Sequence, residues 1–479
     1  MTYRLRHNVE LVDRDGECFL MSKSPLCVLR INRSLADLVG RGINGSLITA
    51  SPAEQCVMEQ LTTKGFAERV RNVSEQPVAM PEVSIIIPVM NRAEELRRCL
   101  TSLSQISYPQ EKIQIIVVDD GSSDDSPQVA RQFGALLVPS GGTGRGPAAA
   151  RNVGAALASG EILAFIDSDC SASTEWLNEL IPSFSNPAMA AVGGQVDGMC
   201  TESGVDRYEA VMSSLSIGSR ERVENSGNDT FYLPSCNLLV RRIAFQSAGG
   251  FKDSMHVGED VDLTWRLRDK GWSITYVPVG NVLHEHRSSI RSFMSRRFDY
   301  GTSEGMLQLL HPKRQKQMVI PPLLAMILLI CLLAPFAGWW LPILAAGILA
   351  VDVVATKVRL MSRNISIGIT SLLKARLRAF GSLLYYLSYH MVRYYATPLL
   401  LVALIAPGPW AWALPAAAIL CAAGVDYAIK KPKLTFIRFS VIYLFEQIAY
   451  GSGVFWGCLS RKCFTSYRVV IFRQMEQAA

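Results

Sequence analysis

The chain has 479 residues, of which 49% are hydrophobic and 19% charged, and its formal net charge is +7. Its 11 cysteines form no C-x-x-C pair and no Cys/His metal spacing, so the sequence supports neither a disulfide framework nor a zinc site. Much of the basic excess lies beside apolar segments in the last third, which favours a membrane surface and excludes nucleic acid as a partner.

Residues 1–80 are predicted to form a small leading domain of short strands and helices. One helix is expected over 32–39, ending at Gly40, and another from Ser51-Pro52 to Lys64. This order resembles the peptide-recognition domains of peptide-modifying pathways, such as the pyrroloquinoline-quinone peptide chaperone, and implies a winged-helix shape. The alternative, that these residues only cap the next domain or support assembly, stays open. Residues 71–81 are predicted to be a linker.

Three short apolar runs, 83–88, 113–118 and 162–166, are predicted to be buried parallel strands, with helices over 93–104, 126–133 and 147–158. Polar residues follow two of these strands, namely Asp119-Asp120-Gly121 and Asp167-Ser168-Asp169. In open α/β sheets, ligands bind at the carboxyl ends of the strands. Asp167 and Asp169 face one side of an extended segment, and such oxygen ligands suit a divalent cation that also contacts phosphate.

A glycine-rich segment at 141–147 matches neither the Walker spacing nor the dinucleotide G-x-G-x-x-G spacing, so a kinase-like or dehydrogenase-like function loses its main support. Further along, Gly258-Glu259-Asp260 precedes a predicted helix over 261–269. By its residues alone, Asp260 is best interpreted as a helix N-cap.

These motifs together resemble family 2 glycosyltransferases of the GT-A fold, an α/β fold that binds nucleotide sugars. The resemblance covers roughly residues 81–310. It is carried by Pro88–Arg92, Val118–Ser122, Ala150–Gly154, Asp167–Asp169 and Gly258–Asp260.

The resemblance implies a role for each motif residue. A UDP-sugar donor would be bound by Pro88, Asn91, Asp120, Arg151 and Asp167, with Asn237 and Glu259 on the acceptor side. Asp167, Asp169 and His286 would hold Mg²⁺ or Mn²⁺, and Asp260 would be the catalytic base of an inverting transfer.

The composition changes after residue 317, and residues 318–479 are predicted to form membrane and interfacial helices. Four apolar spans are expected, in two hairpins: 319–336 with 341–354, and 381–405 with 410–425. Basic segments follow the second and the fourth span and mark the cytoplasmic side. This predicts a multi-pass protein of the plasma membrane, in contact with lipid, whose catalytic domain (81–317) faces the cytoplasm. Residues 441–459 are predicted to be re-entrant or interfacial, or alternatively a helix packed on the catalytic domain.

The order of leader, catalytic domain and membrane region resembles the mycofactocin-system glycosyltransferases of actinobacteria. That resemblance implies UDP-glucose as donor, a peptide-derived redox cofactor or its precursor peptide as acceptor, and a β-1,4-glucan chain as product. Two alternatives stay open: a membrane glycosyltransferase that makes a cell-envelope glycolipid or polysaccharide, and an inactive peptide-binding membrane scaffold. Met294, Arg297 and Phe298 replace the Gln-x-x-Arg-Trp motif of processive synthases, which weakens the case for cellulose-synthase-like processivity.

Overall fold

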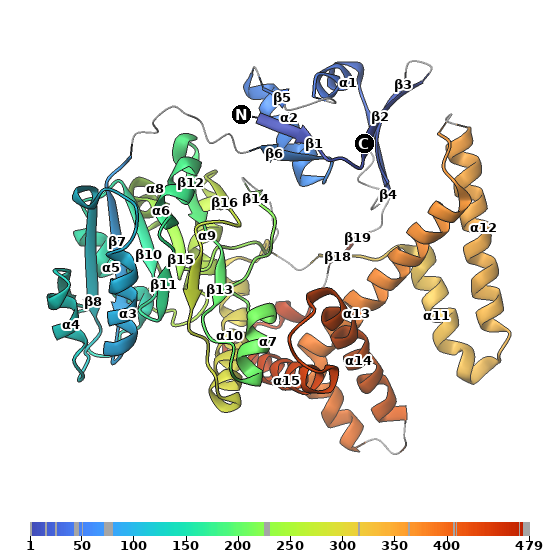
Figure 1. Cartoon of the computed structure of the whole chain (residues 1–479). Coiled ribbons are helices and arrows are strands. Elements are labelled where there is room, and N and C mark those ends of the chain that lie inside the picture. The colour runs from blue at the N-terminus through green and yellow to red at the C-terminus, as the bar shows by residue number, and fades with distance from the viewer. Residues whose placement is uncertain are drawn as a thin grey trace. The chain divides into compact units, whose positions relative to one another are not determined.

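The computed structural model describes residues 2–14, 17–23, 26–42, 47–49, 51–70, 80–224, 230–314, 317–362, 365–405, 408, 410–468 and 470–472. The chain forms two compact units. The first contains residues 1–77, 319–384 and 472–479, and the second contains 78–318 and 385–471. The elements of both are labelled in Figure 1. Most of the predicted linker lies outside the described residues.

The N-terminal part of the first unit has two three-stranded sheets, ordered β5-β1-β6 and β2-β3-β4, and two helices. Asn32 caps α1 and Ser51 caps α2, and each side chain accepts a hydrogen bond from a backbone N–H of the first turn. Both helices lie where the sequence predicts them. The bounds are β1 Thr2–Leu5, β2 Val9–Arg14, β3 Glu17–Lys23, β4 Leu26–Ile31, α1 Arg33–Gly40, β5 Leu47–Ile48, α2 Pro52–Thr63 and β6 Ala67–Val70.

The second unit is built on an eight-stranded mixed sheet with the order β14-β16-β12-β15-β10-β7-β8-β9. Strands β10, β7, β8 and β9 are parallel, whereas β15 runs antiparallel to both of its neighbours. Every residue of β7 and β10 is buried, which explains their continuous apolar sequences. The strands are β7 Val83–Val89, β8 Ile113–Asp119, β9 Leu136–Pro139, β10 Ile162–Ile166, β12 Met189–Gly193, β14 Arg222–Glu224, β15 Asn237–Arg241 and β16 Ser273–Tyr276.

A second, small sheet joins three segments that are far apart in the sequence. It contains β11 Cys170–Ala172, β17 Val282–His284 and β13 Val196–Gly198. In its antiparallel β11–β17 pair, Cys170 lies opposite His284, so the residues that follow β10 are held against the end of β17. The helices of this region are α3 Ala93–Leu103, α4 Ser126–Gln132, α5 Pro147–Leu157, α6 Trp176–Leu180, α7 Gly204–Met212, α8 Arg242–Ala248, α9 Glu259–Asp269 and α10 Ile290–Leu310.

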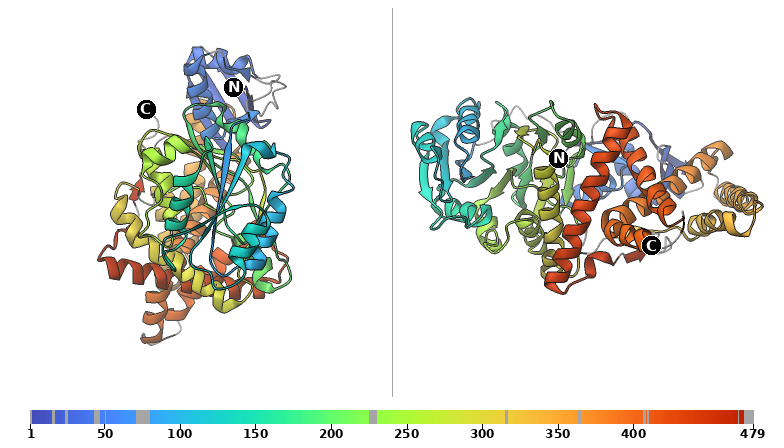
Figure 2. Two further views of the ribbon diagram at one scale, coloured as in Figure 1. Left: turned by 90° about the vertical axis from the view of Figure 1, so that its left-hand side faces the viewer. Right: turned by 90° about the horizontal axis from the view of Figure 1, so that it is seen from below.

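Helix α15 (Phe436–Arg461) lies along α10, and the views of Figures 1 and 2 agree on this arrangement. Four glycines allow the close approach, because a Cβ on any of them would lie 2.0–2.6 Å from backbone atoms of the other helix: Gly301, Gly305, Gly453 and Gly457. The segment 441–459 is therefore part of a continuous helix packed on α10 of the second unit, which agrees with the alternative prediction of a packed helix.

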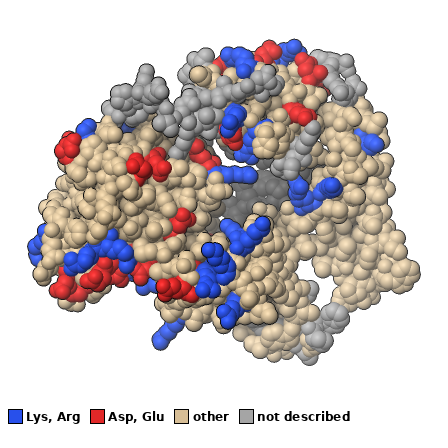
Figure 3. Space-filling view, viewed as in Figure 1, with Lys and Arg blue, Asp and Glu red and all other residues tan. Residues whose placement is uncertain are grey.

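The remaining C-terminal helices differ from the predicted set of four spans. They are α11 Pro322–Ala337, α12 Leu341–Met361, α13 Ile369–Ile405 and α14 Trp410–Lys430, and two short strands flank them, β18 Gln317–Val319 and β19 Val470–Phe472. Among the described residues, only α12 is long and apolar enough to cross a membrane, and α11 is a shorter apolar helix. On the face in Figure 3, the surface of these two helices is almost free of charge.

The multi-pass prediction is thus not supported. Buried polar groups also join the C-terminal helices to one another. Asp426 of α14 accepts a hydrogen bond from Tyr385 of α13, at 2.8 Å. Arg393 of α13 lies 3.3 Å from Glu446 of α15, which is 4% exposed. Apolar side chains of these helices pack together with those of α7 and α10. Part of their apolar surface thus packs on protein, whereas Leu404, Ile405 and Ile429 are exposed, and composition alone does not distinguish the two.

Candidate active site

A cavity of about 700 Å³ opens at the carboxyl ends of β7, β8 and β10. It is lined by the strand ends, by the start of α9, by α10, and by residues of α13 and α15, all of which belong to the second unit. Of the residues predicted to act, those that line it are Pro88, Asp120, Arg151, Asp167, Asp169, Glu259, Asp260 and His286. The sheet topology therefore gathers most of the predicted site into one space.

Asp120 organises the glycine-rich loop that follows β9. Its carboxylate is 5% exposed and accepts hydrogen bonds from the hydroxyl of Ser140 at 2.6 Å and from the backbone N–H groups of Arg145 and Gly146 at 3.0 and 2.8 Å. Gly146 has φ +92°, and a Cβ there would lie 2.5 Å from the ring of His256. The loop is thus folded around a carboxylate, and glycine is required where it turns.

Arg151 connects two of the predicted acidic residues. It lies on α5 with its side chain 3% exposed, and it donates hydrogen bonds to Asp167 at 2.6 Å and to Glu259 at 2.8 Å. The two carboxylates raise the pKa of Arg151 even though burial works in the opposite direction. The guanidinium is therefore a permanent charge that fixes Asp167 and Glu259.

Asp169 faces His284 across the β11–β17 pair. Its Oδ1 is buried without a hydrogen bond partner among the described residues and lies 3.6 Å from His284 Nε2, while its Oδ2 bonds to Arg92. His284 Nδ1 is likewise buried without such a partner. Burial tends to raise the pKa of Asp169, but His284 and Arg92 hold it below its usual value. This carboxylate is anionic and has one oxygen available.

Asp169, Cys170 and His284 offer ligand atoms that all lie within 4.8 Å of one another. Burial raises the pKa of Cys170 well above its usual value, so its thiol stays protonated and is a poor ligand. Asp169 and His284 remain, and their oxygen and nitrogen donors are compatible with Mn²⁺ or Mg²⁺. The donor set therefore fits a divalent cation.

His286, the histidine predicted to complete the metal site, is directed elsewhere. Its ring stacks on His284 at 4.9 Å between centroids, and its Nδ1 lies 3.8 Å from Glu209. Burial, together with His284 and Arg297, lowers the pKa of His286 to about 3, so the ring is neutral. The structure thus brings His284, rather than His286, to Asp169.

Asp260 lies in the first turn of α9, not at its N-cap, because the helix begins two residues earlier than predicted. Gly258, with φ +80°, is the cap. The carboxylate of Asp260 accepts hydrogen bonds from the backbone N–H of Val261 at 2.8 Å and of Ser235 at 3.3 Å. Burial and the neighbouring Glu259 outweigh these bonds and raise the pKa of Asp260 to about 7. A carboxylate of this kind can accept a proton near neutral pH.

Two predicted residues have other positions. Asn237 is fully buried, donates hydrogen bonds to the carbonyls of Gln195 and Gly280, and accepts one from Trp176, so it braces the sheet and does not line the cavity. Asn91, with φ +53°, accepts hydrogen bonds from Ser123 and joins the loop after β7 to the turn after β8. Asn91 also lies outside the lining of the cavity.

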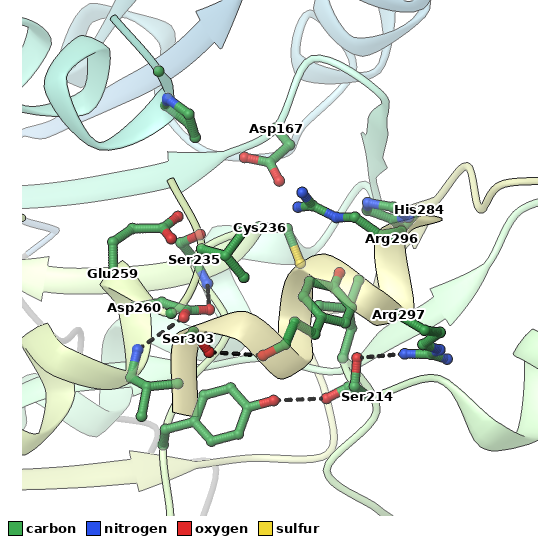
Figure 4. A pocket seen from close by; sticks show the side chains of 18 of the residues that line it. Asp167, Ser214, Ser235, Cys236, Glu259, Asp260, His284, Arg296, Arg297 and Ser303 are labelled. Atoms are coloured by element: carbon green, nitrogen blue, oxygen red, sulfur yellow. Dashed lines mark hydrogen bonds between the residues drawn. The ribbon is translucent and has the colours of Figure 1, made fainter. Parts of the chain in front are cut away.

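Several lining residues were not predicted from the sequence, and Figure 4 shows some of them. Arg296 of α10 reaches toward Asp167 and His284, whereas Arg297 points away from them and donates a hydrogen bond to Ser214 at 3.0 Å. Arg297 also bonds to the buried Glu209 at 2.9 Å. The sequence shows the Arg296-Arg297 pair. Which of the two arginines faces the cavity depends on how α10 is oriented about its own axis, and the sequence does not show this.

Comparison with known proteins agrees with this geometry. Residues 84–249 match the family model described as glycosyl transferase family 2. The similarity to family 2 glycosyltransferases thus covers most of the central sheet. This mixed α/β sheet is GT-A-like, and the carboxylates predicted to act lie at its carboxyl edge, in the matched segment and just after it.

The curated relatives of this glycosyltransferase domain include the pre-mycofactocin glycosyltransferase of Mycobacterium tuberculosis, 37% identical over 53% of this chain and 55% of the relative. Glycosyltransferase AglE of Haloferax volcanii is 34% identical over 41% of this chain and 64% of its own length. The chain thus spans little more than half the length of the first of these. Among solved structures, a mannosyltransferase from Pyrobaculum calidifontis in complex with GDP-Man and Mn²⁺ has 20% sequence identity and a TM-score of 0.40, covering 75% of this chain and 90% of the other.

Proposed function

We propose that this protein is a metal-dependent, inverting glycosyltransferase that transfers glucose from UDP-glucose to the peptide-derived redox cofactor mycofactocin or its precursor, building a β-1,4-glucan chain. The observation that carries the transferase assignment is the presence of two kinds of carboxylate in one cavity. Asp169 is anionic and paired with His284, while Asp260 has a pKa of about 7. The similarity to the pre-mycofactocin glycosyltransferase supports the acceptor.

The donor would lie along the strand ends, with its base near Pro88 and Asp120 and its diphosphate toward Asp167, Asp169 and His284. Asp169 and His284 would hold Mg²⁺ or Mn²⁺, which would supply charge stabilisation for a departing diphosphate. Arg151 fixes the Asp167 carboxylate that faces the donor, and Arg92 fixes Asp169. These residues therefore position the diphosphate before reaction.

Asp260 accepts the proton of the attacking acceptor hydroxyl in this mechanism. The hydroxyl oxygen forms a bond to the anomeric carbon as the bond to the diphosphate oxygen breaks, and a single displacement of this kind inverts the anomeric configuration. The raised pKa matches the task, since a base with a pKa near the working pH combines a deprotonated population with adequate basicity.

Helix α12 supports membrane attachment, because it is 21 residues long and largely apolar. A single crossing by α12 would separate α10 from α15, which pack together, so we propose that α11 and α12 enter the membrane together. The residues before α11 and after α12 then lie on one side, and we place that side in the cytoplasm, because nucleotide sugars are available there and basic residues follow α12: Lys374, Arg376 and Arg378. A protease-protection experiment on intact and permeabilised cells tests this orientation.

The decisive experiment is transfer of radiolabelled glucose from UDP-glucose by membranes that contain the protein, with mycofactocin precursor and membrane lipids offered as acceptors. Asp260→Asn should lower transfer by about 10²–10⁴-fold with UDP binding intact. Asp125→Asn is a matched control, because Asp125 is exposed before α4 and its side chain caps nothing. Near-normal transfer by Asp260→Asn would refute the base, and label found only in lipid would refute the acceptor.

A further inference from the structure

The cavity of the glycosyltransferase domain continues beyond the donor carboxylates to residues of the C-terminal helices. Arg393 and Tyr394 of α13, Tyr450 of α15 and Glu304 of α10 all line it. All four lie outside the segment 84–249 that matches the family model. On α10, Glu304 follows Arg296 by eight residues, which corresponds to about 12 Å along the helix axis. This cluster and the donor carboxylates therefore line different parts of one cavity.

The side chains of this cluster hold one another in place. Glu304 Oε1 accepts hydrogen bonds from the hydroxyls of Tyr450 at 2.6 Å and Tyr394 at 3.2 Å. The Arg393 guanidinium lies 3.4 Å from the centre of the Tyr450 ring and 3.3 Å from Glu446. Tyr394 is 7% exposed and its ring meets that of Tyr450 edge to face. Such mutual contacts reduce the conformational entropy that a ligand would have to remove.

The composition of the cluster indicates which ligand it suits. A carboxylate accepts hydrogen bonds from hydroxyl groups, a guanidinium donates to their oxygens, and aromatic faces pack against C–H groups. Glu446 offsets the charge of Arg393, and Glu304 adds a second carboxylate to this part of the cavity, which disfavours an anionic ligand such as a phosphate. A hydroxyl-rich ring satisfies all three kinds of group.

We propose that Glu304, Arg393, Tyr394 and Tyr450 form a carbohydrate subsite that binds a sugar residue of the acceptor. This inference rests on the proposed glycosyltransferase function. The acceptor hydroxyl that reacts must lie at Asp260, so the sugar bound between α10, α13 and α15 belongs to the body of the acceptor. The subsite favours acceptors that already carry sugar, and it thereby favours elongation over addition of the first residue.

The test measures carbohydrate binding separately from turnover. The full chain is purified in a detergent that contains no sugar, and cellobiose binding is measured by saturation-transfer NMR, with UDP binding measured by calorimetry. Tyr450→Phe and Glu304→Gln each remove one hydrogen-bonding group without removing bulk. Tyr386→Phe is the matched control, because this tyrosine also lies on α13 but is 58% exposed and absent from the cavity lining.

We expect each cluster variant to weaken cellobiose binding by about 10-fold, which corresponds to ~1.4 kcal/mol, with UDP affinity and the control unchanged. If the wild-type protein does not bind cellobiose, the proposed subsite is wrong. It is also wrong if the cluster variants bind cellobiose as tightly as the wild-type protein does. Equal loss of UDP affinity also overturns it, because the cluster would then act only on the fold. If cellobiose binds as expected but no donor turns over, the proposed function fails while the carbohydrate site stands.

Discussion

The contact between α10 and α15 predicts a severe effect from a single added methyl group. A Cβ at Gly453 would lie 2.0 Å from the carbonyl oxygen of Phe298 and 2.9 Å from its carbon, and both are backbone atoms that cannot rotate away. Gly453→Ala therefore forces the two helices apart. Overpacking of this kind costs about 3 kcal/mol at its upper range. The better helix propensity of alanine returns about 1 kcal/mol, so the net loss of stability is about 2 kcal/mol.

Separation of the helices also changes the cavity, since Tyr300 and Glu304 face it from α10 and Tyr450 faces it from α15. Gly453→Ala should thus lower both the melting temperature and the transfer rate. Thermal unfolding measures the melting temperature, and radiolabelled glucose transfer measures the rate, both on the same purified sample. Gly424→Ala is the matched control: it lies inside α14, and a Cβ there would meet nothing within 4 Å.

The control should be neutral or more stable by up to about 1 kcal/mol, because only the helix propensity changes. If Gly453→Ala melts at the same temperature as Gly424→Ala, α10 and α15 are not in the close contact described above. The expected effect on the cavity is then refuted as well.

Three further predictions concern the site. The transfer rate should fall as pH drops through about 7, because protonation of Asp260 removes the base; a pH–rate profile without this acidic limb would contradict the assignment. His284→Ala should raise the Mn²⁺ concentration for half-maximal transfer by at least about 10-fold, whereas alanine at the exposed His7 should change nothing, and an unchanged metal requirement excludes His284 as a ligand. Arg297→Met should cost about 3–5 kcal/mol in chemical denaturation, because Glu209 loses its buried partner; adding Glu209→Gln should recover part of that loss.

The sequence predicted the three adjacent parallel strands β10, β7 and β8 of the eight-stranded sheet well, because local patterns determine them. Buried apolar runs ended in polar turns, and parallel pairing brought Asp120 and Asp167 to one edge. Local sequence patterns could not show whether His284 or His286 contacts Asp169. Both alternate with Glu285 and share one side of an extended segment, and only the pairing of β17 with β11 decides which ring meets Asp169. The register between two strands that lie far apart in the sequence cannot be predicted from the local sequence of either strand.

The C-terminal helices were harder to predict for a different reason. An apolar helix that packs on protein and one that contacts lipid have nearly the same composition. The glycines at 453 and 457 lie one turn apart, and only their position against α10 shows that they serve a helix contact. Asn237 was predicted to lie on the acceptor side, but its amide is buried and hydrogen-bonded to Trp176 and Gly280. No sequence motif indicates these hydrogen bonds.

The pairing of α10 with α15 also sets an order for synthesis of the chain. Helix α10 ends at residue 310 and α15 begins at residue 436, so 125 residues lie between them, and these include the apolar helix α12. At about 5–20 residues per second, the ribosome needs roughly 6–25 s to make this stretch. The glycine face of α10 is therefore uncovered until the apolar region has been made. The part of the cavity lined by α13 and α15 forms last, after synthesis of the candidate membrane helix.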